Sequence, residues 1–134
     1  MIDLSSIGAK FETDLSREFG LQRVPGSGNQ SHSKLDLVGN GFRWSLKATD
    51  RASISIKSSD IAEAVEACFG LNGTGETPLW AYRIGDRDMV MMRKEDFAAL
   101  ARGELKAINE ERGKEKANER LRRAATPSLL RDGN

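Results

Sequence analysis

The chain is poor in the residues that build cross-links and metal clusters: its 134 residues include one cysteine, Cys68, and one histidine, His32. A single cysteine excludes an internal disulfide, and with one histidine a structural zinc ion would lack ligands. These absences predict a reducing, intracellular compartment. The first residues lack a basic segment followed by an apolar one, so we expect no signal peptide. No apolar run approaches the ~18 residues that span a bilayer, so we expect no membrane partner.

Net charge is also nearly absent, because the chain contains 21 Lys and Arg residues and 20 Asp and Glu residues. This balance excludes a histone-like basic protein and a polyacidic tail, but it says nothing about how charge is distributed. Residues 17–57 carry seven basic and three acidic residues, a local charge of +4. Residues 61–102 carry five basic and seven acidic residues, a local charge of −2. We therefore expect a basic side suited to phosphate backbones and an acidic side behind it.

Hydrophobic periodicity predicts a helix over 6–19, where Ile7, Phe11, Leu15 and Phe19 recur at every fourth position. Further elements are expected in this order: strands 21–24, 35–38 and 42–48, an extended stretch 53–57, a helix capped by Ser58-Ser59-Asp60 and ending at Gly70, strands 79–84 and 89–92, and a helix 94–101. This order predicts an α/β domain over residues 1–102, with a mixed central sheet flanked by helices. Residues 103–134 are expected to be a charged helical or disordered tail.

Two polar residues of the predicted strands are candidates for chemistry. Asp36 precedes the predicted tight turn at 39–41 and Lys47 follows it, so we expect the two side chains to lie on neighbouring strands. A carboxylate is a hard oxygen ligand for a divalent cation, which neutralises developing charge and lowers the pKa of its water. The lysine positions or deprotonates that water, or stabilises the charged transition state. Glu12 of the first helix is a candidate second carboxylate.

Three short runs appear here in a distinctive order: Arg23-Val24-Pro25-Gly26-Ser27-Gly28, then Leu35-Asp36-Leu37-Val38, then Ser45-Leu46-Lys47-Ala48-Thr49. Together they resemble the core of the PD-(D/E)XK nucleases, most of all the archaeal-type Holliday junction resolvases, over residues 8–84. The resemblance implies a restriction-endonuclease-like fold and an endodeoxyribonuclease that uses Mg²⁺, with Mn²⁺ as a substitute. It implies branched or four-way-junction DNA as substrate. A homodimer is expected, because symmetric cutting of a junction needs two sites related by a two-fold axis.

The resemblance also implies residue roles. The implied metal ligands are Glu12, Asp36 and the backbone carbonyl of Leu46, and the implied catalytic lysine is Lys47. Ser27 is implied to touch the scissile phosphate or its neighbour. The wider set expected to contact DNA is Arg23, Asn29, His32, Lys34, Thr49, Arg51 and Lys57.

One departure from the family pattern concerns Ser45, which occupies the acidic position of the acidic-x-Lys motif. A hydroxyl is a far poorer ligand for Mg²⁺ than a carboxylate. Three interpretations stay open: Glu12 fills the vacancy, Asp50 reaches in from beyond the strand, or the site is weak or inactive and the chain is a DNA-binding module. A protein-interaction subunit that works through the charged tail is a further alternative.

The same residues also have simpler interpretations that involve no DNA or metal. Taken singly, Glu12 and Lys47 are typical of solvated surface positions, and Asp36 is typical of a turn-capping residue at a strand end. Cys68 is expected to be a small core residue, whereas Trp44 and Trp80 fit either the core or a dimer interface. Met89, Met91 and Met92 are expected in the core or at strand ends. The length and the lack of targeting signals favour a cytoplasmic location, in a bacterium or in the host of a phage.

Overall fold

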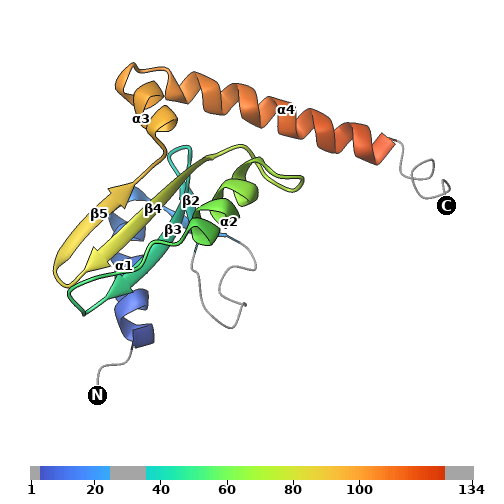
Figure 1. Cartoon of the computed structure of the whole chain (residues 1–134). Helices are drawn as coiled ribbons and strands as arrows, with labels where there is room; N and C mark the ends of the chain where they lie inside the picture. The colour runs from blue at the N-terminus through green and yellow to red at the C-terminus, as the bar shows by residue number, and fades with distance from the viewer. Residues whose placement is uncertain (1–3, 25–35, 126–134) are drawn as a thin grey trace.

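The computed structural model describes residues 4–24 and 36–125, which form five strands and four helices. In chain order they are α1 (Leu4–Phe19), β1 (Gln22–Arg23), β2 (Asp36–Gly39), β3 (Phe42–Thr49), α2 (Ser58–Phe69), β4 (Thr77–Ile84), β5 (Arg87–Met91), α3 (Lys94–Ala101) and α4 (Leu105–Ala125). The five strands form one sheet in the order β1-β2-β3-β4-β5, in which only β3 and β4 run parallel. The predicted α/β class with a mixed sheet flanked by helices is confirmed (Figure 1).

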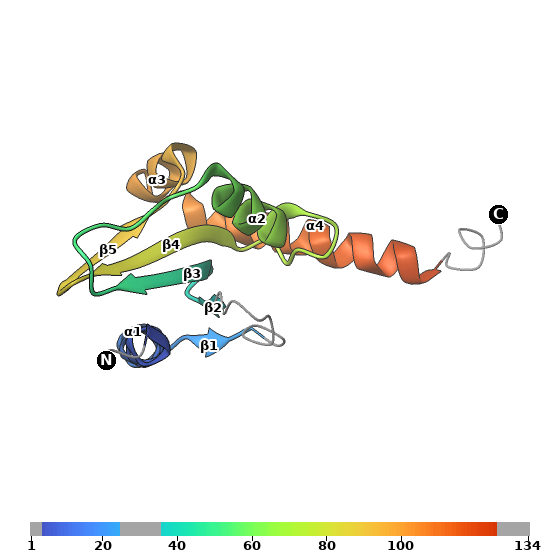
Figure 2. The ribbon, with the colours of Figure 1, turned by 60° about the horizontal axis from the view of Figure 1, so that its bottom comes forward.

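Helix α1 covers one face of the sheet because its apolar stripe has a matching apolar surface there. Phe11 and Leu15 are buried against Leu37, Trp44 and neighbouring side chains of β4. Helix α2 lies on the opposite face, so the sheet forms the middle of three layers (Figure 2). Each helix therefore shields a different set of alternating strand residues.

The β2–β3 hairpin fixes which residues lie on which face. Its turn residues Asn40 and Gly41 both have positive φ, 59° and 86°, as a type I′ turn requires. The Asn40 side-chain amide donates to the carbonyl of Phe19 at 2.9 Å, which ties this turn to the end of α1. The turn sets the register that pairs Asp36 with Ser45. Because side chains alternate along a strand, the polar residues of β2 and β3 share the face opposite to α1.

Helix α2 completes the crossover from β3 to the parallel strand β4, as a parallel pair requires. Ala64 of α2 is buried against Trp80 and Tyr82 of β4. The expectation that Ser58-Ser59-Asp60 provides the cap is wrong for the N-cap position, which Lys57 occupies without a side-chain capping hydrogen bond. Residues 53–57 pair with no strand, although Ile54 packs against the α2 core.

Helix α4 confirms helical structure for residues 105–125 of the predicted tail. Its contacts with the sheet domain are mostly polar. The Thr77 hydroxyl donates to Asn109 Oδ1 at 2.6 Å, and Asn109 Nδ2 donates to the carbonyl of Gly41 at 3.1 Å. Lys116 Nζ donates to the carbonyls of Phe69 and Gly70 at 2.9 and 2.8 Å. An apolar pattern cannot reveal such docking, which is why it was absent from the sequence prediction.

Both tryptophans lie in the core, with Trp44 4% and Trp80 3% exposed, so the core alternative is the one observed. Cys68 is fully buried, as expected. Burial raises the pKa of its thiol to about 12. In the described part of the chain, no helix is both long and apolar enough to cross a membrane.

Candidate functional site

The strand register brings Asp36, Ser45 and Lys47 to one face of the sheet. Asp36 of β2 lies opposite Ser45 of β3, and Lys47 follows two residues further along β3. Across the other edge of β3, Ser45 lies beside Trp80 and Lys47 beside Tyr82. The prediction that Asp36 and Lys47 lie on adjacent strands is therefore confirmed.

The carboxylate of Asp36 is held by a residue that the sequence prediction had counted only as a positive charge. Arg43 donates from Nε and Nη2 to Asp36 Oδ2 at 3.1 and 3.0 Å. The side chain of Asp36 is 19% exposed and that of Arg43 is 21% exposed, so solvent screens this pair less than it would screen a surface ion pair. A guanidinium therefore already neutralises the carboxylate on which a metal site would depend.

Lys47 is exposed, and its ammonium donates to the carbonyl of Ser55 at 2.9 Å. Ser55 belongs to the connection between β3 and α2. This connection also carries the exposed residues Arg51 and Lys57. The backbone N–H of Arg51 donates to Thr49 Oγ1 at 3.1 Å, which shapes the chain where it leaves β3. Lys47 and two cations expected to contact DNA, Arg51 and Lys57, thus belong to β3 and the segment that follows it.

Glu12 is not brought together with Asp36 and Lys47. Arg23 donates from Nε and Nη2 to both carboxylate oxygens of Glu12, at 2.7 to 2.9 Å. The register pairs Arg23 with Leu37, whose side chain faces α1. The Glu12–Arg23 pair therefore lies on the α1 side of the sheet, whereas Asp36 and Lys47 project from the opposite face. The interpretation in which Glu12 fills the position of Ser45 does not match this geometry.

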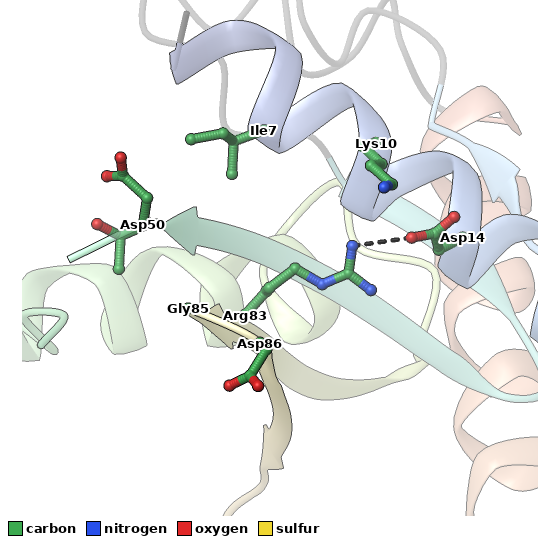
Figure 3. A pocket seen from close by; sticks show the side chains of 8 residues that line it. Ile7, Lys10, Asp14, Asp50, Arg83, Gly85 and Asp86 are labelled. Carbon is green, nitrogen blue, oxygen red and sulfur yellow. Dashed lines mark hydrogen bonds and ion pairs between the residues drawn. The ribbon is translucent and has the colours of Figure 1, made fainter. Parts of the chain in front are cut away.

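Asp50 lies at a cavity of about 530 Å³ instead of on the Asp36 face. The cavity lies between α1 and the ends of β3 and β4, and its lining residues are Ile7, Lys10, Asp14, Thr49, Asp50, Arg83, Gly85 and Asp86 (Figure 3). Thr49, expected to contact DNA, is therefore a lining residue here. The second open interpretation, in which Asp50 reaches the metal position, is not what the structure shows.

Arg83, which the sequence prediction missed, organises this cavity. It donates to Asp88 at 2.6 Å and to Asp14 at 2.8 Å, and its guanidinium lies 4.7 Å from the centre of the Phe11 ring. The hydrogen bond with Asp88 raises the pKa of Arg83 and lowers the pKa of Asp88. These contacts join α1, β4 and β5, so the role of Arg83 is to stabilise the fold. Its alternating position on a strand gave no sign of these partners.

A second missed residue, Asp60, lies in the first turn of α2. Desolvation raises the pKa of Tyr82, and the charge of Asp60 raises it further. Asp60 therefore lies near Tyr82, the β4 neighbour of Lys47. The sequence marked it only as a helix-start residue, because spacing along the chain does not show which face a helix covers.

The donors for Mg²⁺ are few. Over residues 4–24 and 36–125, no three Asp, Glu, His or Cys side chains are grouped so that they could hold a metal ion. Hydrogen bonding alternates along a strand, and Gly39 and Phe42 form the pair that flanks the turn. The carbonyl of Leu46 is therefore directed toward the β2 side of β3, just beyond Asp36. One carboxylate and one carbonyl fit Mg²⁺ only in an open site, where water and substrate phosphate supply the other ligands.

Four of the expected DNA-contacting residues, Ser27, Asn29, His32 and Lys34, lie outside the described residues. Comparison of the chain with protein-family models, with curated proteins and with solved structures finds no match.

Proposed function

We propose that this chain is a metal-dependent, structure-selective endodeoxyribonuclease with a restriction-endonuclease-like core, acting on branched DNA such as a Holliday junction. The observation that carries the proposal is the side-by-side placement of Asp36, Ser45 and Lys47 on β2 and β3. The mixed sheet with a helix on either face agrees with such a core. Neighbouring cations of the β3–α2 connection supply attraction for a phosphate backbone that does not depend on base sequence.

In this function each residue has a distinct task. The ammonium of Lys47 orients the attacking water or stabilises charge on the phosphate. The Ser45 hydroxyl donates a hydrogen bond to a phosphate oxygen. Asp36 and the Leu46 carbonyl would hold Mg²⁺ together with the substrate, and Arg43 would have to share or release Asp36. When bound, the ion supplies charge neutralisation and a water of lowered pKa.

The Arg43–Asp36 pair favours a second function, DNA binding without cleavage. Asp36 neutralised by a guanidinium is a weak metal ligand, because the two cations compete for the same carboxylate. Ser45 adds a neutral donor at the position where a second carboxylate is expected. In this alternative, Arg43, Ser45 and Lys47 hold phosphate oxygens directly, and no metal takes part.

The two functions are separated by assaying a labelled four-way junction and a linear duplex of matched sequence, with Mg²⁺, Mn²⁺ or EDTA. The proteins compared are the wild type, Asp36→Asn, Lys47→Ala and the control Lys106→Ala, whose site is exposed on α4. Metal-dependent junction cleavage that only Asp36→Asn and Lys47→Ala abolish supports the nuclease. Cleavage that survives in both variants contradicts it. Junction binding that is equal in EDTA and in metal, without any cutting, assigns the second function. Circular dichroism and thermal melting of each variant identify those that fail to fold.

A further inference from the structure

Strand β5 is an edge of the sheet, with β4 on one side and no strand of the described chain on the other (Figure 1). Its register with β4 starts at Ile84–Arg87, the pair that flanks the two-residue turn Gly85-Asp86. Hydrogen-bonded and non-hydrogen-bonded pairs alternate from such a turn. Asp88 and Val90 therefore direct their N–H and C=O groups away from β4. Such an edge is a template for another strand.

The middle of this edge is also apolar on both faces. Met89 is 58% exposed and Val90 61% exposed. Met89 lies opposite Tyr82 and so projects to the α2 side, whereas Val90 lies opposite Ala81 and projects to the α1 side. The expectation that Met89 belongs to the core or a strand end is thus corrected, because Met89 lies in the middle of β5 with more than half of its surface exposed. The charge of Asp88 is neutralised by Arg83, which removes one of the usual protections of an edge.

We propose that a second copy of this chain pairs with β5 in antiparallel orientation, about a two-fold axis that passes through Met89. The two sheets then become one continuous sheet. Asp88 of one copy exchanges hydrogen bonds with Val90 of the other, and the two Met89 side chains meet at the axis. A second copy suits this edge because every residue pair that this register creates is compatible in charge.

Neighbouring registers are less compatible. An axis through Asp88 would place the two Asp88 carboxylates directly opposite each other, and an axis through Val90 would oppose Arg87 to Arg93 of the second copy. Like charges in directly opposed positions destabilise a strand pair. In the Met89 register, Arg87 faces Met91 and Asp88 faces Val90. The charge pattern of β5 therefore selects one register for self-association.

The axis of such a pair runs perpendicular to the sheet, so each face of one copy continues into the same face of the other. Both Asp36–Lys47 faces would then lie on the same side of the joined sheet, where one branched DNA molecule could contact both. The dimer itself depends only on β5. It therefore stands or fails independently of the nuclease activity.

The test uses the full chain in sedimentation velocity and light scattering over a range of concentrations. The wild type is expected to be a dimer. Met89→Lys and Met89→Glu, which place like charges at the axis, are expected to weaken dimerisation at least ~tenfold when each is alone. A one-to-one mixture of the two is expected to restore a heterodimer. The matched control is Leu121→Lys, which changes a residue of α4 that is 69% exposed and should leave the dimer intact.

A second measurement uses Met89→Cys. Non-hydrogen-bonded antiparallel pairs bring Cα atoms to about 4.5 Å, within the range of a disulfide. Mild oxidation is expected to give a covalent dimer on a non-reducing gel, whereas Cys68 is buried and does not compete. A wild type that is monomeric at every concentration overturns the proposal, as does a dimer that both charged variants leave unchanged. A dimer whose charged variants fail to recombine, and which Met89→Cys fails to cross-link, overturns the register.

Discussion

The guanidinium of Arg43 lies 3.0 Å from the carboxylate of Asp36, on the sheet face that also carries Lys47. Asp36 and Arg43 are diagonal neighbours on β2 and β3, because the register pairs Arg43 with Val38. An internal cation thus lies against the carboxylate expected to bind a metal ion. Under the two proposed functions, the choice between DNA cleavage and DNA binding alone depends on how readily this pair opens.

Replacing Arg43 with Gln is expected to tighten Mn²⁺ binding by several-fold, because the competing cation is removed from Asp36. The free energy of unfolding should fall by ~1 kcal/mol, since a partly shielded charge-assisted hydrogen bond is lost. Isothermal titration calorimetry with Mn²⁺ and urea unfolding measure the two effects. The control is Arg87→Gln on exposed β5, which should leave Mn²⁺ binding unchanged. Equal Mn²⁺ affinities for wild type and Arg43→Gln would contradict the competition.

Ser45→Glu is expected to create a second carboxylate beside Asp36, since directly opposed residues have Cβ atoms about 5 Å apart. Without metal, the added like charge should lower the melting temperature. Mn²⁺ should raise it again, and metal-dependent junction cleavage should increase at least ~tenfold over the wild type. Ser45→Gln is the matched neutral control and should show neither response. A Ser45→Glu protein that melts at the same temperature with and without Mn²⁺ would count against a metal site on this face.

Glu12→Gln is expected to leave Mn²⁺ binding and junction cleavage at the wild-type level, because the sheet separates Glu12 from Asp36. Its effect should be confined to stability, a loss below ~1 kcal/mol from weakening the bidentate pair with Arg23. Arg23→Gln should cause a similar loss, and the double variant should cost little more than either single change. A tenfold or larger loss of cleavage in Glu12→Gln would show that this carboxylate reaches the metal after all.

The Arg83–Asp88 pair predicts a pH dependence of stability. The hydrogen bond from Arg83 holds the pKa of Asp88 below its ordinary value. The folded state therefore binds this proton more weakly than the unfolded state, so the pair stabilises the fold fully above about pH 4 and loses its effect as the pH falls through the lowered pKa. Asp88→Asn should remove that part of the acid dependence. Urea unfolding at several pH values between about 3 and 6 measures it, and an unchanged slope would contradict the assignment.

The buried thiol of Cys68 should be inert in the native protein. Its pKa of about 12 leaves almost no thiolate at about pH 8.5, where an ordinary cysteine is half ionised. Labelling with a chromogenic disulfide reagent is expected to be slow in buffer and complete in denaturant. Fast labelling of the native chain would show that α2 opens readily.

Local pattern was enough for most elements of the fold. The every-fourth-residue stripe of Phe11 and Leu15 predicted α1, and Gly39-Asn40-Gly41 predicted the hairpin that aligns β2 with β3. Such signals work because periodicity and turn geometry are properties of contiguous residues. The adjacency of Asp36 and Lys47 follows from them, since two strands joined by a tight turn have one register.

The partners of the charged side chains required the tertiary structure. The sequence determined that Glu12 lies on a helix and Arg43 on a strand, but not that Glu12 binds Arg23 or that Arg43 binds Asp36. It showed charge in residues 105–125, but not that Asn109 and Lys116 dock on backbone carbonyls. A long polar side chain pairs with the group that lies near it in space. That proximity depends on which face of the sheet each helix covers, and only the tertiary structure determines this.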